Sequence, residues 1–346
     1  MSRPRRLFSR ALTAVLTAAL AVPPLVSASG PAAAEDGDTA PATAKIYAEY
    51  VAMGDSFSAG PLIPQQRPDL LGCLKSTNNY PSFLATYIPT IRSFTDVTCS
   101  GAETTDMRER QSTIVPGPSP APQLDALTPG TDLVTLGIGG NDYGLFGSMI
   151  SKCEEVASED PDGAPCKEHY TVDGVDTKKR DARRIQPRVG RVVREILERS
   201  PKADVFVFGY PRLLPEEGTC AEVPFAAGDY VWGNQIERIL NRSIRRAAEN
   251  NGATYINLYP ASLGHDACAG DKAWINGSEI KPTEAANFHP YLKGMRGVSR
   301  AAYRQISGGP APRVQYASTF ADPVVPPLDE EQLTHLAGYL EEYLVP

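Results

Sequence analysis

Residues 132–142 read DLVTLGIGGND, and this stretch decides the fold. Its first part is mostly apolar and runs directly into a glycine cluster. A short apolar run bounded in this way is typical of a strand that is buried on both faces. Residues 50–54, 204–209 and 253–258 have the same character, and residues 92–98 alternate enough to form another strand.

Amphipathic helix patterns lie between these strands. Residues 184–199 carry apolar side chains at helical spacing, and residues 232–250 show a second such pattern that ends before Gly252. Residues 79–88 are compatible with another helix. Strands and helices that alternate in this way predict an α/β fold, in which helices cover both faces of a parallel sheet.

Sheets of this kind place functional sites at the carboxyl ends of their strands. Ser56 follows the first strand, after Gly54, which permits a tight turn into a helix. A serine in this position can be a nucleophile, but it can equally be a helix N-cap. Asn141 follows residues 132–138 and offers an amide donor, although Asn-Asp after glycine is also common turn chemistry. Gly101 follows another strand and offers a backbone N–H group.

The chain has four histidines, and His289 precedes a proline late in the sequence. Histidine is the side chain used most often as a general base near neutral pH. A lone histidine is more commonly structural or exposed, so His289 carries little weight by itself. No cluster of His, Cys or carboxylate residues has metal-ligand spacing, and we therefore expect no metal site.

Taken together, these segments resemble the SGNH (GDSL) hydrolase family. The match consists of Gly54-Asp55-Ser56, Gly101, Gly139-Gly140-Asn141-Asp142 and His289-Pro290, which agree in order and spacing with the four sequence blocks of that family. The four blocks span nearly the whole chain after its amino-terminal segment. Residues 98–102 (TCSGA) and 209–212 (GYPR) are similar to segments of its secreted, three-disulfide actinobacterial esterases and lipases.

The resemblance implies a flavodoxin-like three-layer α/β/α sandwich with a parallel sheet. It implies that Ser56 is the nucleophile and His289 the general base of a carboxylic ester hydrolase. It also implies an oxyanion hole formed by the backbone N–H groups of Ser56 and Gly101 and the side-chain amide of Asn141. Acyl transfer needs donors aimed at the developing oxyanion, and such a site requires neither a metal nor an organic cofactor.

One position departs from the family pattern. Many members have Asp three residues before the His, where this chain has Ala286. Some actinobacterial relatives use a backbone carbonyl in place of the Asp. We expect the carbonyl of Ala286 to orient His289, with that of Asn287 as the second candidate. Glu284 is the nearest carboxylate in the sequence and is the rival candidate.

The amino terminus has the layout of a secretory signal peptide, with arginines before a moderately apolar run and small residues after it. We expect residues 1–34 to be this signal and residues 35–44 a flexible leader, so that the protein is secreted. Residues 45–346 are expected to form a single hydrolase domain with a C-terminal extension at about 308–346. The apolar run is too short to span a bilayer comfortably, so we expect no stable membrane insertion.

The chain has six cysteines, and none of them forms a C-x-x-C pair. An even number of cysteines behind a signal peptide is typical of a disulfide set. Several pairings are possible, and sequential pairing is the economical one because each bond then closes a local loop. This order predicts the disulfides Cys73–Cys99, Cys153–Cys166 and Cys220–Cys268.

The formal net charge is -7 at pH 7, and no basic stripe follows the amino terminus. We therefore do not expect a nucleic-acid partner. The leading expectation is a monomer that hydrolyses small-molecule or lipid esters. Two alternatives remain open: deacetylation of a polysaccharide such as xylan, and a non-catalytic secreted binding protein on the same fold. The intact set of Ser56, Asn141 and His289 argues against the binding protein.

Overall fold

The computed structural model describes residues 45–113, 115–317 and 326–344. The expected signal peptide and leader lie outside the described residues. The strands are β1 (Glu49–Gly54), β2 (Ser93–Asp96), β3 (Leu133–Gly137), β4 (Thr171–Val172), β5 (Val175–Asp176), β6 (Asp204–Phe208) and β7 (Thr254–Ile256). The α-helices are α1 (Ser56–Ala59), α2 (Tyr80–Tyr87), α3 (Leu145–Val156), α4 (Pro165–His169), α5 (Thr177–Arg199), α6 (Ala227–Glu249), α7 (Leu292–Ser307) and α8 (Glu330–Leu344).

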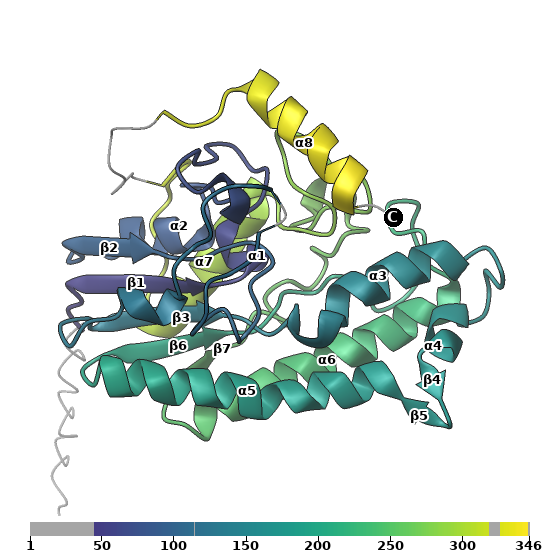
Figure 1. Cartoon of the computed structure of the whole chain (residues 1–346), viewed down its shortest axis with the longest axis horizontal. Coiled ribbons are helices and arrows are strands. Elements are labelled where there is room, and N and C mark those ends of the chain that lie inside the picture. Colours follow the sequence, from purple (N-terminus) through teal and green to yellow (C-terminus); the bar gives the residue numbers. More distant parts are fainter. Residues whose placement is uncertain (1–44, 114, 318–325, 345–346) are drawn as a thin grey trace, which may run out of the picture. The chain divides into compact units, whose positions relative to one another are not determined.

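A parallel sheet forms the middle layer, and within the described residues it has five strands in the order β2-β1-β3-β6-β7 (Figure 1). Strand β3 lies in the middle of the sheet between β1 and β6, and all five of its residues are buried. Strands β4 and β5 form a separate antiparallel hairpin. The predicted α/β class is confirmed.

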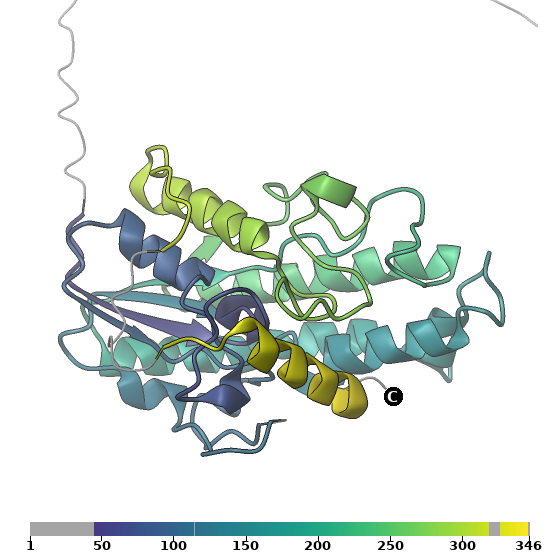
Figure 2. The ribbon, with the colours of Figure 1, turned by 90° about the horizontal axis from the view of Figure 1, so that it is seen from above.

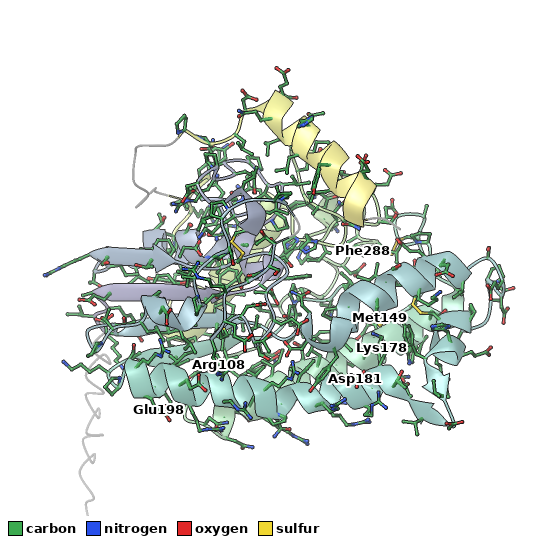
Figure 3. All side chains as sticks on the ribbon, in the orientation of Figure 1. Arg108, Met149, Lys178, Asp181, Glu198 and Phe288 are labelled. Atoms are coloured by element: carbon green, nitrogen blue, oxygen red, sulfur yellow. A yellow bond between two sulfur atoms is a disulfide. The ribbon has the colours of Figure 1, made fainter. Side chains whose placement is uncertain are left out.

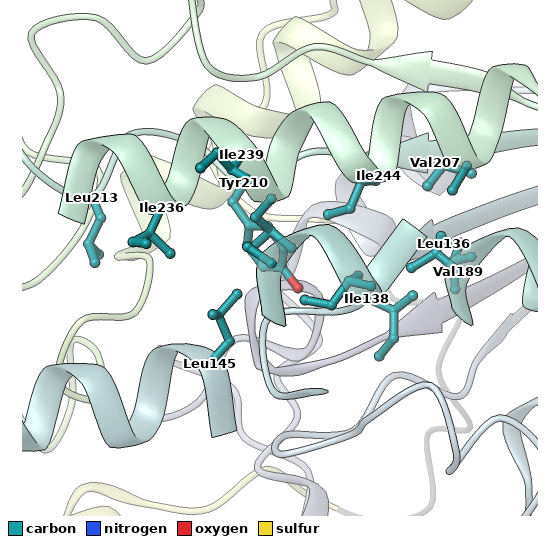
Figure 4. Packing of buried hydrophobic residues seen from close by; sticks show 14 of the residues in the cluster. Leu136, Ile138, Leu145, Val189, Val207, Tyr210, Leu213, Ile236, Ile239 and Ile244 are labelled. Atoms are coloured by element: carbon teal, nitrogen blue, oxygen red, sulfur yellow. The ribbon is translucent and has the colours of Figure 1, made fainter. Parts of the chain in front are cut away.

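Helices cover both faces of this sheet. Helices α5 and α6 pack on one face, where Val189 and Ile244 meet Leu136 and Val207 of the strands (Figure 4). Helices α2 and α7 cover the other face, and they run side by side in the view from above (Figure 2). Adjacent residues of a strand point to opposite faces, so the strands must be apolar throughout to fill both layers. The result is the three-layer sandwich that the family resemblance implies.

Helix α5 is longer than the sequence pattern predicts, because it begins at Thr177 rather than at residue 184. Asp176 caps it by accepting a hydrogen bond from the backbone N–H of Lys179 at 2.9 Å. The first turns lie beside the start of α3 rather than on the sheet, and Lys178 there donates to the carbonyl oxygen of Gly144 at 2.9 Å. These turns therefore lack the apolar stripe by which the rest of the helix is recognised.

Helix α8 packs on the body of the protein through one apolar face. Leu333, Leu336, Ala337 and Leu340 of α8 form a cluster with Leu62, Leu74, Ile280 and Ala286. The segment before α8 is held by a hydrogen bond from the N–H of Leu328 to the carbonyl oxygen of Gln66 at 3.0 Å. Helix α8 is therefore part of the folded structure around the carboxyl edge of the sheet.

The structure contains the disulfides Cys73–Cys99, Cys153–Cys166 and Cys220–Cys268, which are the sequential pairs predicted above. The first joins the loop after β2 to the turn at Leu71–Cys73. The second joins α3 to α4. None of the helices in the described part of the chain combines the length and the apolar character needed to cross a membrane.

Candidate active site

Ser56 lies where β1 ends and α1 begins, at the carboxyl edge of the sheet. Gly54 has a φ of +151°, and a Cβ atom there would lie 2.5 Å from the carbonyl oxygen of Gly137. Only glycine therefore fits this close approach of β1 and β3. Asp55 caps α1 by accepting a hydrogen bond from the backbone N–H of Phe57 at 3.0 Å. This turn holds the Ser56 side chain against a pocket that it helps to line.

Three candidate hydrogen-bond donors line the same pocket: Ser56, Gly101 and Asn141. Gly101 has a φ of +80°, which glycine adopts without strain. Among the described residues, no acceptor is hydrogen-bonded to the backbone N–H of Ser56 or of Gly101. The Asn141 amide donates one N–H to the carbonyl oxygen of Ala102 at 3.0 Å, so its second N–H is free to turn toward the pocket.

His289 also lines the pocket, and its Nδ1 atom lies 2.6 Å from the carbonyl oxygen of Asn287. The prediction that Ala286 supplies this carbonyl is therefore wrong. The carbonyl oxygen of Ala286 instead accepts the backbone N–H of His289 at 3.2 Å and the side-chain amide of Asn276 at 3.1 Å. The Ala286 carbonyl is thus already engaged in two hydrogen bonds, and the second candidate, Asn287, takes its place at Nδ1.

His289 is half-buried and lines the pocket. This burial lowers the pKa of His289 to about 4, because the charged form loses hydration, and the hydrogen bond to Asn287 offsets only part of that effect. The ring centroid of Phe57 lies 5.4 Å from that of His289. Among the described residues, no carboxylate forms an ion pair or hydrogen bond with His289. The imidazole is thus neutral near pH 7 and able to accept a proton.

Asn276 fixes the segment that carries His289. Its backbone N–H donates to the carbonyl oxygen of His289 at 2.9 Å, and its side-chain amide donates to Glu279 at 2.6 Å as well as to Ala286. The N–H of Ala286 donates to the carbonyl oxygen of Pro61, just beyond α1, at 3.1 Å. These bonds tie the histidine segment to the serine segment, although more than 200 residues separate them in the sequence.

Tyr210 connects two of the predicted motifs, and the sequence patterns gave it no such role. Its buried hydroxyl donates to a carboxylate oxygen of Asp55 and accepts the backbone N–H of Gly140 at 2.8 Å. Burial raises the pKa of Asp55 to about 7, while the hydrogen bonds from Tyr210 and Phe57 act in the opposite direction. Figure 4 shows the tyrosine ring packed among aliphatic side chains between α6 and the start of α3.

Asp142 anchors the segment that carries Asn141. Its buried carboxylate accepts hydrogen bonds from the hydroxyl of Thr104 at 2.6 Å and from the guanidinium of Arg188 at 2.7 Å. Thr104 follows Gly101 in the chain, so one carboxylate holds both donor-bearing loops in place. The charge of Asp142 is compensated by Arg188, as a buried carboxylate requires.

The pocket has a volume of about 290 Å³ and lies between α1, α3, α8 and the segment before His289. Leu74, Ile280, Ala286 and Leu340 give it an apolar wall. Phe288 also lines it, and Figure 3 places this ring between α8 and α3. A mostly apolar cavity with a few convergent polar groups is the usual form of a small-molecule site.

Metal ligands do not gather in this pocket among the described residues. Within the described part of the chain, the one group spaced closely enough to hold a metal ion lies outside the pocket and consists of Cys153, Cys166 and Asp229. Both of its sulfur atoms are joined in a disulfide, and Asp229 accepts the backbone N–H groups of Cys166 and Lys167 at 3.0 and 2.9 Å. This group is therefore fully used by the structure itself.

A model of the GDSL-like lipase/acylhydrolase family matches residues 52–296. The chain is 39% identical over 266 residues to Lipase 2 of Streptomyces coelicolor, an alignment that covers 74% of this chain and 85% of the relative. Among solved structures, it is similar to phospholipase A1 of Streptomyces albidoflavus, with a TM-score of 0.62 and 28% identity over 75% of this chain and 98% of the other. It is also similar to an extracellular lipase of Streptomyces rimosus, with a TM-score of 0.59 and 26% identity over 74% and 98% of the two chains.

Proposed function

The chain belongs to the GDSL-like lipase/acylhydrolase family and is a carboxylic ester hydrolase, and from this premise we propose that Ser56 is its nucleophile and His289 its general base. The observation that carries the proposal is the convergence of Ser56, Gly101, Asn141 and His289 on one pocket. These residues come from four separate segments of the chain. If Ser56 were only a helix cap, or His289 only a structural residue, there would be no reason for the other three residues to line the same pocket.

The first half of the reaction forms an acyl-enzyme. The carbonyl oxygen of Asn287 keeps a proton on Nδ1 of His289, so Nε2 can accept the proton of the Ser56 hydroxyl. The Ser56 oxygen then attacks the ester carbonyl carbon. The N–H groups of Ser56, Gly101 and Asn141 stabilise the resulting oxyanion. Collapse of this intermediate expels the alcohol, which takes its proton from His289.

The second half returns the enzyme to its starting state. Water enters the pocket and gives a proton to Nε2 of His289 as it attacks the acyl carbon. The second oxyanion occupies the same donors, and its collapse releases the carboxylic acid while His289 returns the proton to Ser56. Each step moves one proton between oxygen and Nε2, so these residues suffice for the reaction without a metal or an organic cofactor.

The apolar wall of the pocket favours an ester with a hydrocarbon acyl chain. Leu74, Ile280 and Leu340 are buried side chains that a chain of methylene groups can contact. Each methylene group transferred from water to such a wall contributes about 0.8 kcal/mol. We therefore place lipid or medium-length acyl esters before acetyl esters, which would fill little of this wall.

We further propose that the protein acts outside the cell. Three disulfides suit an oxidising compartment, and residues 1–34 have the pattern of a signal peptide. Residues 45–346 would then act as one domain that includes the extension at 308–346. This view is supported by the packing of α8 against the pocket wall. We expect the protein to act as a monomer, because helix α8 of the same chain completes the wall of the pocket.

A panel of p-nitrophenyl esters of increasing acyl length tests the function. We expect turnover that rises with chain length beyond acetate. Ser56→Ala should lower kcat at least about a thousand-fold while the protein stays folded. Ser58→Ala changes a buried serine of the same helix and serves as the matched control. Turnover of acetate alone would indicate a deacetylase, and no turnover by the folded wild type would indicate a binding protein.

A further inference from the structure

The pocket beside Ser56 combines aromatic rings with carboxyl groups. Phe57, Phe146, Tyr210 and Phe288 line it together with Glu154 and Glu237. Among the described residues that line this pocket, none is a lysine or an arginine. The set is unusual for a cavity that takes only a hydrocarbon chain, because a carboxyl group loses hydration on the wall of such a cavity.

Glu237 of α6 is almost completely buried, with 2% of its surface exposed. One carboxyl oxygen, Oε2, accepts the backbone N–H of Leu213 at 3.2 Å. The other oxygen, Oε1, has no hydrogen-bond partner among the described residues. Burial raises the pKa of Glu237 to about 8, so in the empty pocket this carboxyl is mostly protonated at pH 7, and a bound cation would favour its ionised form.

Glu154 of α3 contributes a second carboxyl group to the same pocket, and its Oε1 atom is likewise without a partner among the described residues. Burial raises the pKa of Glu154 as well. The next residue, Glu155, is exposed and pairs with Lys152. Two adjacent glutamates of one helix thus differ in environment, and the one that faces the pocket lacks a cation.

The two arginines whose charge acts on Glu237 are already engaged by other groups. Arg212 and Arg238 both form ion pairs with Glu216 at 2.7 and 3.0 Å. Both guanidinium groups also lie over the ring of Tyr259, at 4.0 and 5.7 Å from its centroid. They lower the pKa of Glu237 only in part, because burial outweighs them. The positive charge that would balance Glu154 and Glu237 is therefore not supplied by Arg212 or Arg238.

We propose that this pocket binds esters that carry a compact organic cation, such as a quaternary ammonium group, with the cation held among the aromatic rings, Glu154 and Glu237 that line it. Aromatic faces attract such cations through their quadrupoles, and the attraction grows when water is excluded. The free carboxyl oxygens are nearly covered by their neighbours. They therefore suit Coulomb attraction across the pocket wall better than a direct hydrogen bond to a hydroxyl group. This inference rests on the proposed ester hydrolysis at Ser56.

Two matched substrates test the inference. Butyrylcholine carries the cation, and the isosteric neutral ester has a carbon atom in place of the nitrogen. We expect the wild type to prefer the cationic ester by at least about tenfold in kcat/KM. Tetramethylammonium chloride should inhibit hydrolysis of the neutral ester competitively, whereas sodium chloride at the same concentration should not.

Variants of Glu154 and Glu237 test whether these residues cause the preference for the cationic ester. Glu154→Gln and Glu237→Gln keep the shape of the side chains but remove the ionisable carboxyl group, so a bound cation can no longer be balanced by a negative charge there. Each variant should lower the kcat/KM ratio of the two esters at least about threefold. The ratio should fall furthest in the double variant, in which only the aromatic rings remain to attract the cation. Glu155→Gln is the control on the same helix and should keep the wild-type ratio. If Glu237→Gln does not fold, the ratio in Glu154→Gln and the inhibition by tetramethylammonium decide the question.

The outcomes separate this inference from the function on which it depends. Hydrolysis of both esters at similar rates by the wild type would overturn the cation site and leave the esterase intact. A cationic preference that stays as large as in the wild type in both glutamine variants would equally overturn it. A wild type that hydrolyses neither ester nor any member of the p-nitrophenyl panel would overturn the proposed function, and the cation site with it.

Discussion

The Nδ1 atom of His289 lies 2.6 Å from the carbonyl oxygen of Asn287. A carbonyl can only accept a hydrogen bond, so the imidazole must carry its proton on Nδ1, and Nε2 is left with a lone pair. A carboxylate in this position would add its charge to the stabilisation of an imidazolium, whereas a carbonyl contributes only a dipole. The proposed catalytic pair is therefore a serine–histidine dyad held by the main chain.

The first prediction follows from the proposed dyad and concerns the carboxylate nearest to His289 in the sequence. Glu284 is exposed, and we expect Glu284→Gln to keep kcat within about tenfold of the wild type, since no charge that acts on His289 is removed. In a true triad, replacing the aspartate by its amide costs about ten-thousand-fold. Steady-state kinetics of the folded variant distinguish the two cases. A thousand-fold loss would show that Glu284 completes a triad.

The second prediction concerns pH. Burial lowers the pKa of His289 to about 4, so the neutral base should persist well below the usual imidazole value of about 6.5. Protonation removes the lone pair of Nε2, and activity is therefore lost as the pH falls. We expect the acid limb of kcat/KM to have its midpoint near 4 rather than near 6.5.

A kcat/KM profile between pH 3.5 and 8 measures this midpoint, with circular dichroism at each pH to exclude unfolding. The folded state takes up the His289 proton only near pH 4, whereas the unfolded chain takes it up near 6.5. Protonation of this histidine therefore lowers the stability of the folded state as the pH falls from about 6.5 to about 4. An acid limb centred between 6 and 7 in a protein that stays folded would contradict the assignment of His289.

The third prediction concerns Tyr210, whose hydroxyl joins Asp55 to Gly140. Tyr210→Phe leaves the buried N–H of Gly140 without an acceptor and the Asp55 carboxyl without its donor, which should cost about 1–3 kcal/mol of stability. Because these two residues flank Ser56 and Asn141, we expect kcat to fall about ten- to a hundred-fold with little change in KM.

Tyr230→Phe provides the matched control for Tyr210→Phe. The Tyr230 hydroxyl donates to the carbonyl oxygen of Val223 at 2.6 Å, and Tyr230 does not line the Ser56 pocket. It should lower the melting temperature by a comparable amount without lowering kcat. Equal kinetic losses in the two variants would mean that Tyr210 acts through general stability rather than by positioning the site.

The sequence indicated the local parts of this candidate site but not the long-range contacts that join them. Ser56 and Asn141 could be located because each follows a buried strand, and strand ends in a parallel sheet meet at one edge. The link between Tyr210 and Asp55 spans 155 residues and follows from the register of β1, β3 and β6, which no local pattern encodes. The choice between Ala286 and Asn287 depended on which carbonyl Asn276 occupies.

The fourth prediction concerns the Cys73–Cys99 disulfide. Cys99 lies two residues before Gly101, and the N–H of Ser100 donates to the carbonyl oxygen of Cys73 at 2.9 Å. Replacing both cysteines by alanine frees a loop of moderate length and should cost about 3–4 kcal/mol. We also expect at least about a tenfold loss of kcat, because the N–H of Gly101 is then less well placed.

Replacing Cys153 and Cys166 by alanine is the comparison for this disulfide. That bond joins α3 to α4, and neither cysteine lines the pocket. Its loss should lower the melting temperature while changing kcat less than the loss of Cys73–Cys99. A reversed order of the two kinetic effects would count against a role of Gly101 in the oxyanion hole.

The last prediction concerns Leu340, which lies outside the family match at residues 52–296 but lines the pocket from α8. Its side chain is fully buried against Leu74, Ile280 and Ala286. Leu340→Trp adds volume to the wall and should shift the preferred acyl chain of the p-nitrophenyl panel toward shorter esters. Leu340→Ala removes contacts to the acyl chain and should lower kcat/KM for long chains, because each methylene group that is no longer buried weakens binding by about 0.8 kcal/mol. Glu341→Ala changes the exposed neighbour on the same helix and should leave the profile unaltered. If the chain-length profile of both Leu340 variants matched that of the wild type, α8 would be packed near the pocket without shaping what enters it.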